Sequence, residues 1–158
     1  MDVKREFLRH TLATLAYRGI KAVSGAPDGF TTTRVCATTR SAGEILAHIG
    51  DLMDWALSMA MGQEAWNPVP PGPWEVDVER FVNGLSAFDL YLRGNDPLGA
   101  PAEKLFQGPI ADALTHVGQI ATLRRLAGAP VRGENYAVAE IAAGRVGTDQ
   151  SVKRFEFD

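Results

Sequence analysis

The sequence contains a single cysteine, Cys36, among its 158 residues. One thiol cannot form a disulfide within the chain, and it cannot build a metal site from several thiolates. Any metal bound by this chain must therefore use histidine and carboxylate side chains. We expect Cys36 to be a small, semi-buried apolar residue rather than a nucleophile, because no neighbouring histidine or helix start is evident to lower its pKa.

The chain also lacks long apolar runs and a large excess of charge of either sign. No run approaches the roughly 20 apolar residues needed to cross a bilayer, and residues 1–6 lead directly into an amphipathic pattern instead of a signal peptide. The 16 basic and 19 acidic residues are mixed along the chain and give a net charge of -3. This distribution offers no basic surface to nucleic acid or to an anionic membrane. We therefore expect a cytoplasmic protein with neither of these partners.

The sequence does contain apolar residues repeated at helical spacing. An apolar content of 46% over 158 residues is enough for one core, and we expect residues 1–158 to form a single domain. Apolar residues recur three and four positions apart in the stretches 3–23, 45–60, 78–92 and 110–121. No alternation typical of strands supports a sheet. The pattern predicts an all-α fold, a four-helix bundle.

Capping and breaking residues mark where some of these helices begin. Ser41 and Glu44 form a capping-box pattern directly before the second apolar stretch. Gly108 and Pro109 precede the fourth stretch, with proline expected at the first helical position, where its missing N–H costs nothing. Both patterns predict helix starts close to the residues considered below as metal ligands.

The remaining segments are predicted from their proline, glycine and asparagine content. Four prolines within 67–73 forbid regular structure and indicate a stiff, ordered connector. Trp66 and Trp74 flank it and either line the mouth of a pocket or pack the connector onto the helices, which we favour. We expect a short additional helix over 135–144, capped by its asparagine, and an extended tail over 147–158.

The fourth predicted helix carries two candidate metal ligands, Asp112 and His116. Their i,i+4 spacing places them above one another on one face of the helix, so they can converge on one ion. Each residue also has a structural alternative. Asp112 can complement the dipole at the start of the helix, and His116 can be a partly buried imidazole bonded to a neighbour. Two ligands make a weak site, so the metal interpretation depends on a third residue.

The second predicted helix offers His48 as that third residue. His48 lies at the edge of the apolar stripe, where it can be a ligand or a hydrogen-bonded boundary residue. Asp51, one turn further on, can orient the imidazole or be solvated, and it is the nearest candidate for a general base. His10 falls nearly opposite the apolar stripe of the first helix, so we expect it to face solvent and to take no part in metal binding.

Two short motifs, in the order in which they occur, resemble a known family. They are Ser41-Ala-Gly-Glu-Ile-Leu-Ala-His48-Ile49 and Asp112-Ala-Leu-Thr-His116-Val-Gly-Gln119-Ile120. They look like the motifs of the DinB/YfiT-like metalloenzymes. The resemblance runs from the first helix to Gly128 and includes the segment 135–147, which some members also have.

This resemblance implies a set of metal ligands. In the family, a histidine of the second helix and an H-x-x-x-H pair of the fourth bind a divalent metal, and the pair often lies just before Gly-Gln-Ile. His48 matches the first ligand and His116 the last, whereas Asp112 replaces the usual middle histidine. Two histidines and one carboxylate still form an acceptable ligand set with open positions. The metal can be zinc, nickel, iron or manganese.

The resemblance also implies an activity. Relatives include thiol-dependent isomerases and S-transferases, so we expect a metal-dependent enzyme of thiol transfer, isomerisation or hydrolysis, with a small-molecule substrate and a low-molecular-weight thiol. Lewis-acid activation would be the mechanism. A homodimer is expected from the resemblance and from Met59 and Met61, which flank the apolar stripe of their helix. The alternative is a non-catalytic bundle, a small-molecule-binding or stress-related protein that has lost its metal.

Overall fold

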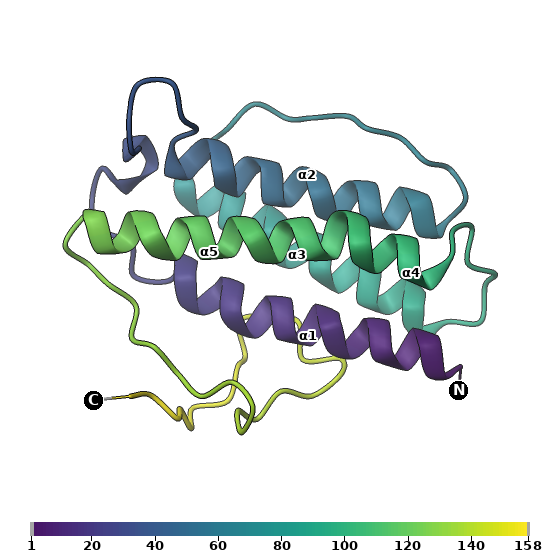
Figure 1. Cartoon of the computed structure of the whole chain (residues 1–158). Coiled ribbons are helices and arrows are strands. Elements are labelled where there is room, and N and C mark those ends of the chain that lie inside the picture. The colour runs from purple at the N-terminus through teal and green to yellow at the C-terminus, as the bar shows by residue number, and fades with distance from the viewer. Residues whose placement is uncertain (1, 158) are drawn as a thin grey trace.

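The computed structural model describes residues 2–157, and helices account for most of them (Figure 1). The four long helices are α1 (Val3–Val23), α2 (Ala42–Ala60), α3 (Trp74–Arg93) and α5 (Ala111–Leu126). Within residues 2–157 the only strand-like pairing is an isolated bridge between Glu134 and Glu156. The predicted all-α class is therefore confirmed. None of these helices is both long and apolar enough to span a membrane.

Each long helix packs against two of the other three. Both α1 and α2 contact α3 and α5, so α5 runs across the front in Figure 1 between α2 and α1, with α3 behind. The apolar faces enclose one continuous core. Its completely buried side chains include Leu12, Ile49, Phe81, Phe88 and Ile120. The contact between α2 and α5 brings the predicted metal ligands together, because they lie along it.

The first turn of α2 is held by the predicted capping box. The Ser41 hydroxyl accepts a hydrogen bond from the Glu44 N–H at 3.3 Å, and the Glu44 carboxylate accepts one from the Ser41 N–H at 2.6 Å. Such reciprocal bonds satisfy two N–H groups that have no partner within the helix. The cap thereby fixes the start of the helix that carries His48.

The start of α5 differs from the prediction. A short helix, α4 (Ala102–Leu105), continues through a π-helical turn at Phe106–Ile110 directly into α5. Pro109 therefore lies inside a continuous helical run, and the prediction that it occupies the first helical position is wrong. Proline removes one N–H donor, and its ring clashes with the carbonyl four residues earlier. The wider i→i+5 turn accommodates both effects, because it does not require the i→i−4 bond.

The prediction of a helix over 135–144 is also wrong. The structure has turns and bends there, and no helix is present between residues 127 and 157. The Asn135 side-chain oxygen accepts a hydrogen bond from the Ala137 N–H at 3.2 Å, which closes a local turn instead of capping a helix. The segment passes along the outside of α1 in Figure 1, so contacts with α1 replace helical hydrogen bonds.

Glu134 anchors this segment to α1. Its buried carboxylate accepts hydrogen bonds from the Tyr17 hydroxyl, from Lys21 Nζ at 2.8 Å and from the Phe155 N–H at 3.3 Å. Burial acts to raise the pKa of Glu134, but the hydrogen bonds from Lys21, Tyr17 and Phe155 outweigh it and hold the pKa below its usual value. The folded protein therefore favours the charged form of this side chain.

We expect Glu134→Gln to destabilise the protein in a pH-dependent way. A carboxyl group with a lowered pKa stabilises the folded state above its ordinary pKa of about 4.3, and this contribution disappears as the pH falls through the folded value. The variant should lose about 1–2 kcal/mol near neutral pH, because Lys21 keeps a weaker partner. The difference from the wild type should shrink below about pH 4. Thermal unfolding across this range measures it, and a difference that does not change with pH would contradict the assignment.

Candidate metal centre

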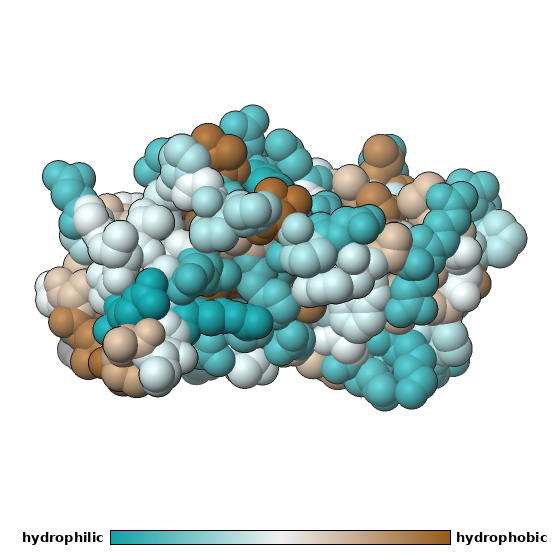
Figure 2. Space-filling view, turned by 90° about the horizontal axis from the view of Figure 1, so that it is seen from above, coloured by the Kyte–Doolittle hydropathy of each residue, from teal (hydrophilic) through white to brown (hydrophobic). Residues whose placement is uncertain are grey.

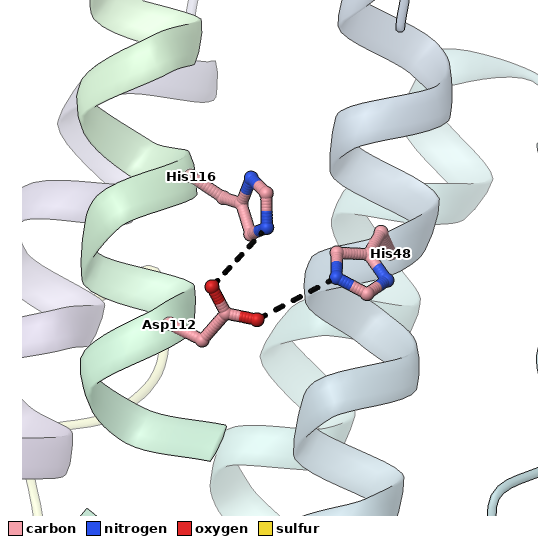
Figure 3. Close-up of side chains that lie close together, drawn as sticks. All are labelled: His48, Asp112 and His116. Atoms are coloured by element: carbon pink, nitrogen blue, oxygen red, sulfur yellow. Dashed lines mark ion pairs between the residues drawn. The ribbon is translucent and has the colours of Figure 1, made fainter. Parts of the chain in front are cut away.

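Helices α2 and α5 bring the three predicted ligands together. Figure 3 shows His48 on α2 facing Asp112 and His116 on α5, with dashed lines that join the carboxylate to both imidazoles. The distance from His48 Nε2 to Asp112 Oδ2 is 3.7 Å, and that from His116 Nε2 to Asp112 Oδ1 is 3.4 Å. One ligand atom from each of the three residues lies within 4.8 Å of the other two. This group can hold a metal ion.

These separations fit a first-row divalent ion. Metal bonds of about 2.0–2.2 Å to nitrogen and oxygen place two tetrahedral ligands about 3.4 Å apart. The two distances from Asp112, 3.4 and 3.7 Å, are close to this value. Atoms as far as 4.8 Å apart need to move closer by about 1.4 Å, which side-chain rotations can supply. Two imidazoles and a carboxylate are donors that such ions accept.

The hydrogen bonding of His116 orients its imidazole toward the centre. Its Nδ1 lies 2.9 Å from Gln119 Oε1, one helical turn further along α5. With the amide oxygen as acceptor, the proton lies on Nδ1, and Nε2 keeps its lone pair on the side of Asp112 and His48. The side chain of His116 is only 10% exposed, so the ring has little freedom to turn away. In the sequence Gln119 stands out only as part of a motif, whereas the structure shows its hydrogen bond to His116.

The surroundings of His48 favour its neutral form. Burial lowers the pKa of His48, and the nearby positive charge of Arg40 and the neighbouring imidazole of His116 lower it further, against the opposing effects of Asp112 and Asp51. Histidine binds metal through its neutral imidazole. A lowered pKa therefore extends the range of pH over which His48 is available as a ligand.

Asp51, the candidate general base, is committed to other contacts. Its Oδ1 accepts hydrogen bonds from Arg80 Nη2 at 2.7 Å and from the Val69 N–H at 3.0 Å. The side chain is 6% exposed, so it is not solvated, and among the described residues it makes no hydrogen bond to His48. Asp51 holds the proline-rich connector against α2. Its role as a base stays a prediction.

The two tryptophans beside the connector have different surroundings. The Trp66 ring lies edge-on to His48, with ring centres 5.7 Å apart, and edge-on to Trp55 at 5.8 Å. Trp66 is 46% exposed and lies beside His48. Trp74 belongs to the first turn of α3 and packs against Phe30 at 5.2 Å. Both tryptophans thus pack against neighbouring rings, and Trp66 does not line the cleft beside His116.

A cleft of about 550 Å³ adjoins His116. It opens between α5 and the segment that leads into α2, and its lining includes Val35, Arg40, Ile45 and Leu123. Figure 2 shows the face on which α2 and the proline-rich connector lie, where apolar residues form separate groups among polar ones. The cleft gives a small molecule access to the side of His116.

Cys36 is exposed, so the prediction that it is semi-buried is wrong. Residues 36–39 form a turn in which the Thr39 N–H donates to the Cys36 carbonyl, and this turn carries the thiol outward. A hydrogen bond with Thr38, whose hydroxyl lies 3.3 Å from the sulfur, lowers the pKa of the thiol. The cause of the lowered pKa is thus a local turn, not the neighbouring histidine or helix start whose absence from the sequence argued against a reactive thiol.

His10 lies on the exposed face of α1, as predicted, and it is not part of the metal-ligand group.

The N-terminal end of α1 leaves Val3 and Phe7 exposed, at 82% and 62%, although both continue the apolar stripe of the helix. The stripe therefore extends beyond the core at the N-terminal end of α1.

Comparisons of the chain with known protein families, with curated proteins and with solved structures found no match. The observations that bear on function are the three converging ligands, the oriented imidazole of His116 and the adjoining cleft.

Proposed function

We propose that this chain is a divalent-metal-dependent enzyme whose ion is held by His48, Asp112 and His116. The convergence of these three donors across two helices supports the proposal most strongly. The imidazole rings are 4.7 Å apart and nearly perpendicular, at 86°. Two protonated histidines so close would repel each other, whereas two neutral imidazoles beside a carboxylate attract a cation. The Gln119 hydrogen bond orients His116 for the same role.

Three protein ligands leave at least one coordination position for water or substrate. Asp112 is 48% exposed, which puts that position in reach of solvent. A bound zinc, nickel, iron or manganese ion would lower the pKa of a bound water or thiol, or polarise a carbonyl. The negative charge of Asp112 reduces the net charge of the site and makes it a weaker Lewis acid than three neutral imidazoles would.

Among reactions of this kind, we propose S-transfer or isomerisation with a low-molecular-weight thiol, with hydrolysis as the alternative. The support is the resemblance of the two motifs to those of the DinB/YfiT-like family, together with four packed helices in the corresponding order. The homodimer stays a prediction. Met61 is 46% exposed and Met59 partly buried, so this part of α2 offers some apolar surface for a second copy.

A non-catalytic protein that binds small molecules is the second candidate. Both oxygens of Asp112 lie within 4 Å of a histidine nitrogen, so the three residues can be joined by ion pairs without a metal. The adjoining cleft of about 550 Å³ would serve either function. Metal content therefore separates the two candidates.

The test uses full-length protein purified without a chelator and without a histidine tag. We expect about one divalent ion per chain by elemental mass spectrometry, since three ligands converge on one centre. Protein that remains free of stoichiometric metal after exposure to zinc, nickel, iron and manganese would favour the non-catalytic candidate.

Cobalt-substituted protein then tests the thiol. Binding of N-acetylcysteine at the open position should produce a sulfur-to-cobalt charge-transfer band, because a coordinating thiol is deprotonated. A cobalt spectrum that does not change with the thiol would argue for hydrolysis instead.

A further inference from the structure

We propose that the cleft beside His116 binds an organic anion with an apolar body, and that Arg40 binds its anionic group. The inference rests on the proposed function, because it makes this anion the substrate and Arg40 a residue that determines specificity. The structure supports it through the position, the lining and the charge of the cleft.

The cleft adjoins the proposed metal centre at one ligand, His116, whereas His48 and Asp112 are outside its lining. His116 and its partner Gln119 form part of its wall, so a molecule in the cleft touches the side of a metal ligand. The volume of about 550 Å³ falls within the range of about 300–1,000 Å³ typical of small-molecule sites. A ligand of several carbon atoms can therefore occupy the cleft with one end at His116.

The walls of the cleft suit an apolar body. Ile45 of α2 and Leu123 of α5 form part of the lining and are only 4% and 2% exposed, so they belong to its inner wall. Val35 comes from the segment that leads into α2 and is 67% exposed, which leaves its side chain free to cover a bound molecule. Burial of a hydrocarbon chain here would remove its own apolar surface and that of Val35 from water.

The charge of the cleft indicates which end group it accepts. Arg40 is the only arginine, lysine, aspartate or glutamate among the described residues that line it. Its neighbour Arg34 lies 3.5 Å from Glu44 and donates to the Thr39 carbonyl, whereas no ion pair joins Arg40 to any carboxylate in residues 2–157. A guanidinium offers a planar pair of donors that matches a carboxylate. Arg40 is thus available to an anion from solvent.

The test follows binding of octanoate to the isotopically labelled, zinc-loaded protein by NMR, with octylamine and octanol as probes of equal chain length. We expect octanoate to shift the resonances of Val35 and Leu123 and to bind at least about tenfold more tightly than either other probe, as expected for a charge-assisted contact. Arg40→Gln should weaken octanoate about tenfold or more. Arg125→Gln removes the same charge from an exposed position on α5 outside the cleft and should change binding less than about twofold.

Binding to His48→Ala separates this inference from the proposed metal site. We expect octanoate to bind this variant through Arg40 even if its metal is lost, so failure of the metal site would leave the cleft result intact. If octanoate binding were lost in His48→Ala but kept in Arg40→Gln, octanoate would be a ligand of the metal, and the inference would be overturned. Equal binding of octylamine, or no shift at Val35 and Leu123 with any probe, would also overturn it. Unchanged spectra elsewhere in Arg40→Gln establish that the variant is folded.

Discussion

His116→Ala is expected to lower the affinity for a divalent metal by about a hundredfold or more, because loss of one of three protein ligands leaves a two-ligand site with which water competes easily. His48→Ala and Asp112→Ala should act in the same direction. The fold should survive in each case, since the apolar core holds α2 and α5 together without an ion. A competition titration with a chromogenic chelator measures the affinity, and thermal unfolding of the metal-free protein measures the stability.

His10→Ala is the matched control for these ligand variants. The residue is a histidine of the same chain, exposed on α1 and outside the ligand group. Its replacement should leave metal affinity unchanged. Full occupancy in one of the three ligand variants would remove that residue from the site, and full occupancy in all three would reject the metal site. Loss of metal in His10→Ala would show that the ligand set is different.

Asp89→Ala is expected to destabilise the protein by about 3 kcal/mol, the cost typical of breaking a buried ion pair. Asp89 accepts hydrogen bonds from Arg9 Nε at 2.9 Å and from Arg9 Nη2 at 3.2 Å, and both side chains are only 9% exposed. The substitution leaves the guanidinium of Arg9 buried between α1 and α3. Its remaining carboxylate partner, Glu6, is 45% exposed and compensates only in part. The melting temperature should fall by roughly 6–12 °C.

Two further variants show whether the buried charge causes this loss. The double variant Arg9→Met with Asp89→Leu removes both charges and should be more stable than Asp89→Ala, since apolar replacements of buried ion pairs are often tolerated. Glu103→Ala breaks the exposed pair with Lys4, in which both side chains are 64% exposed, and should not change the melting temperature measurably. Equal melting temperatures for Asp89→Ala and Glu103→Ala would contradict the assigned role of the buried pair.

Much of the helical structure could be predicted because its signals are local. The apolar period that predicts a helix over 3–23 corresponds to α1, and the Ser41 and Glu44 pattern corresponds to the capping box of α2. Such signals arise from residues within one or two turns of each other. The same holds for the i,i+4 relation of Asp112 and His116.

The errors occurred where distant contacts override local signals. Pro109 is typical of a helix start, but packing keeps it within a continuous run through a π turn. The asparagine and apolar pattern at 135–144 is typical of a short helix, yet Glu134 ties that segment to α1. The hydrogen bonds from Tyr17 and Lys21 to Glu134 join residues more than 100 positions apart in the sequence, and no local pattern contains them.

The sequence by itself determined the helical class, the four long helices and a pair of possible ligands on one helical face. Only the tertiary structure decided that His48 lies close to this pair, that Arg80 donates a hydrogen bond to Asp51 and that Arg40 lines a cleft beside His116. The physical reason is that helical periodicity fixes which side of a helix a residue occupies. The distance between residues of two helices depends on how the whole apolar core packs, and through it on the rotation of α2 against α5.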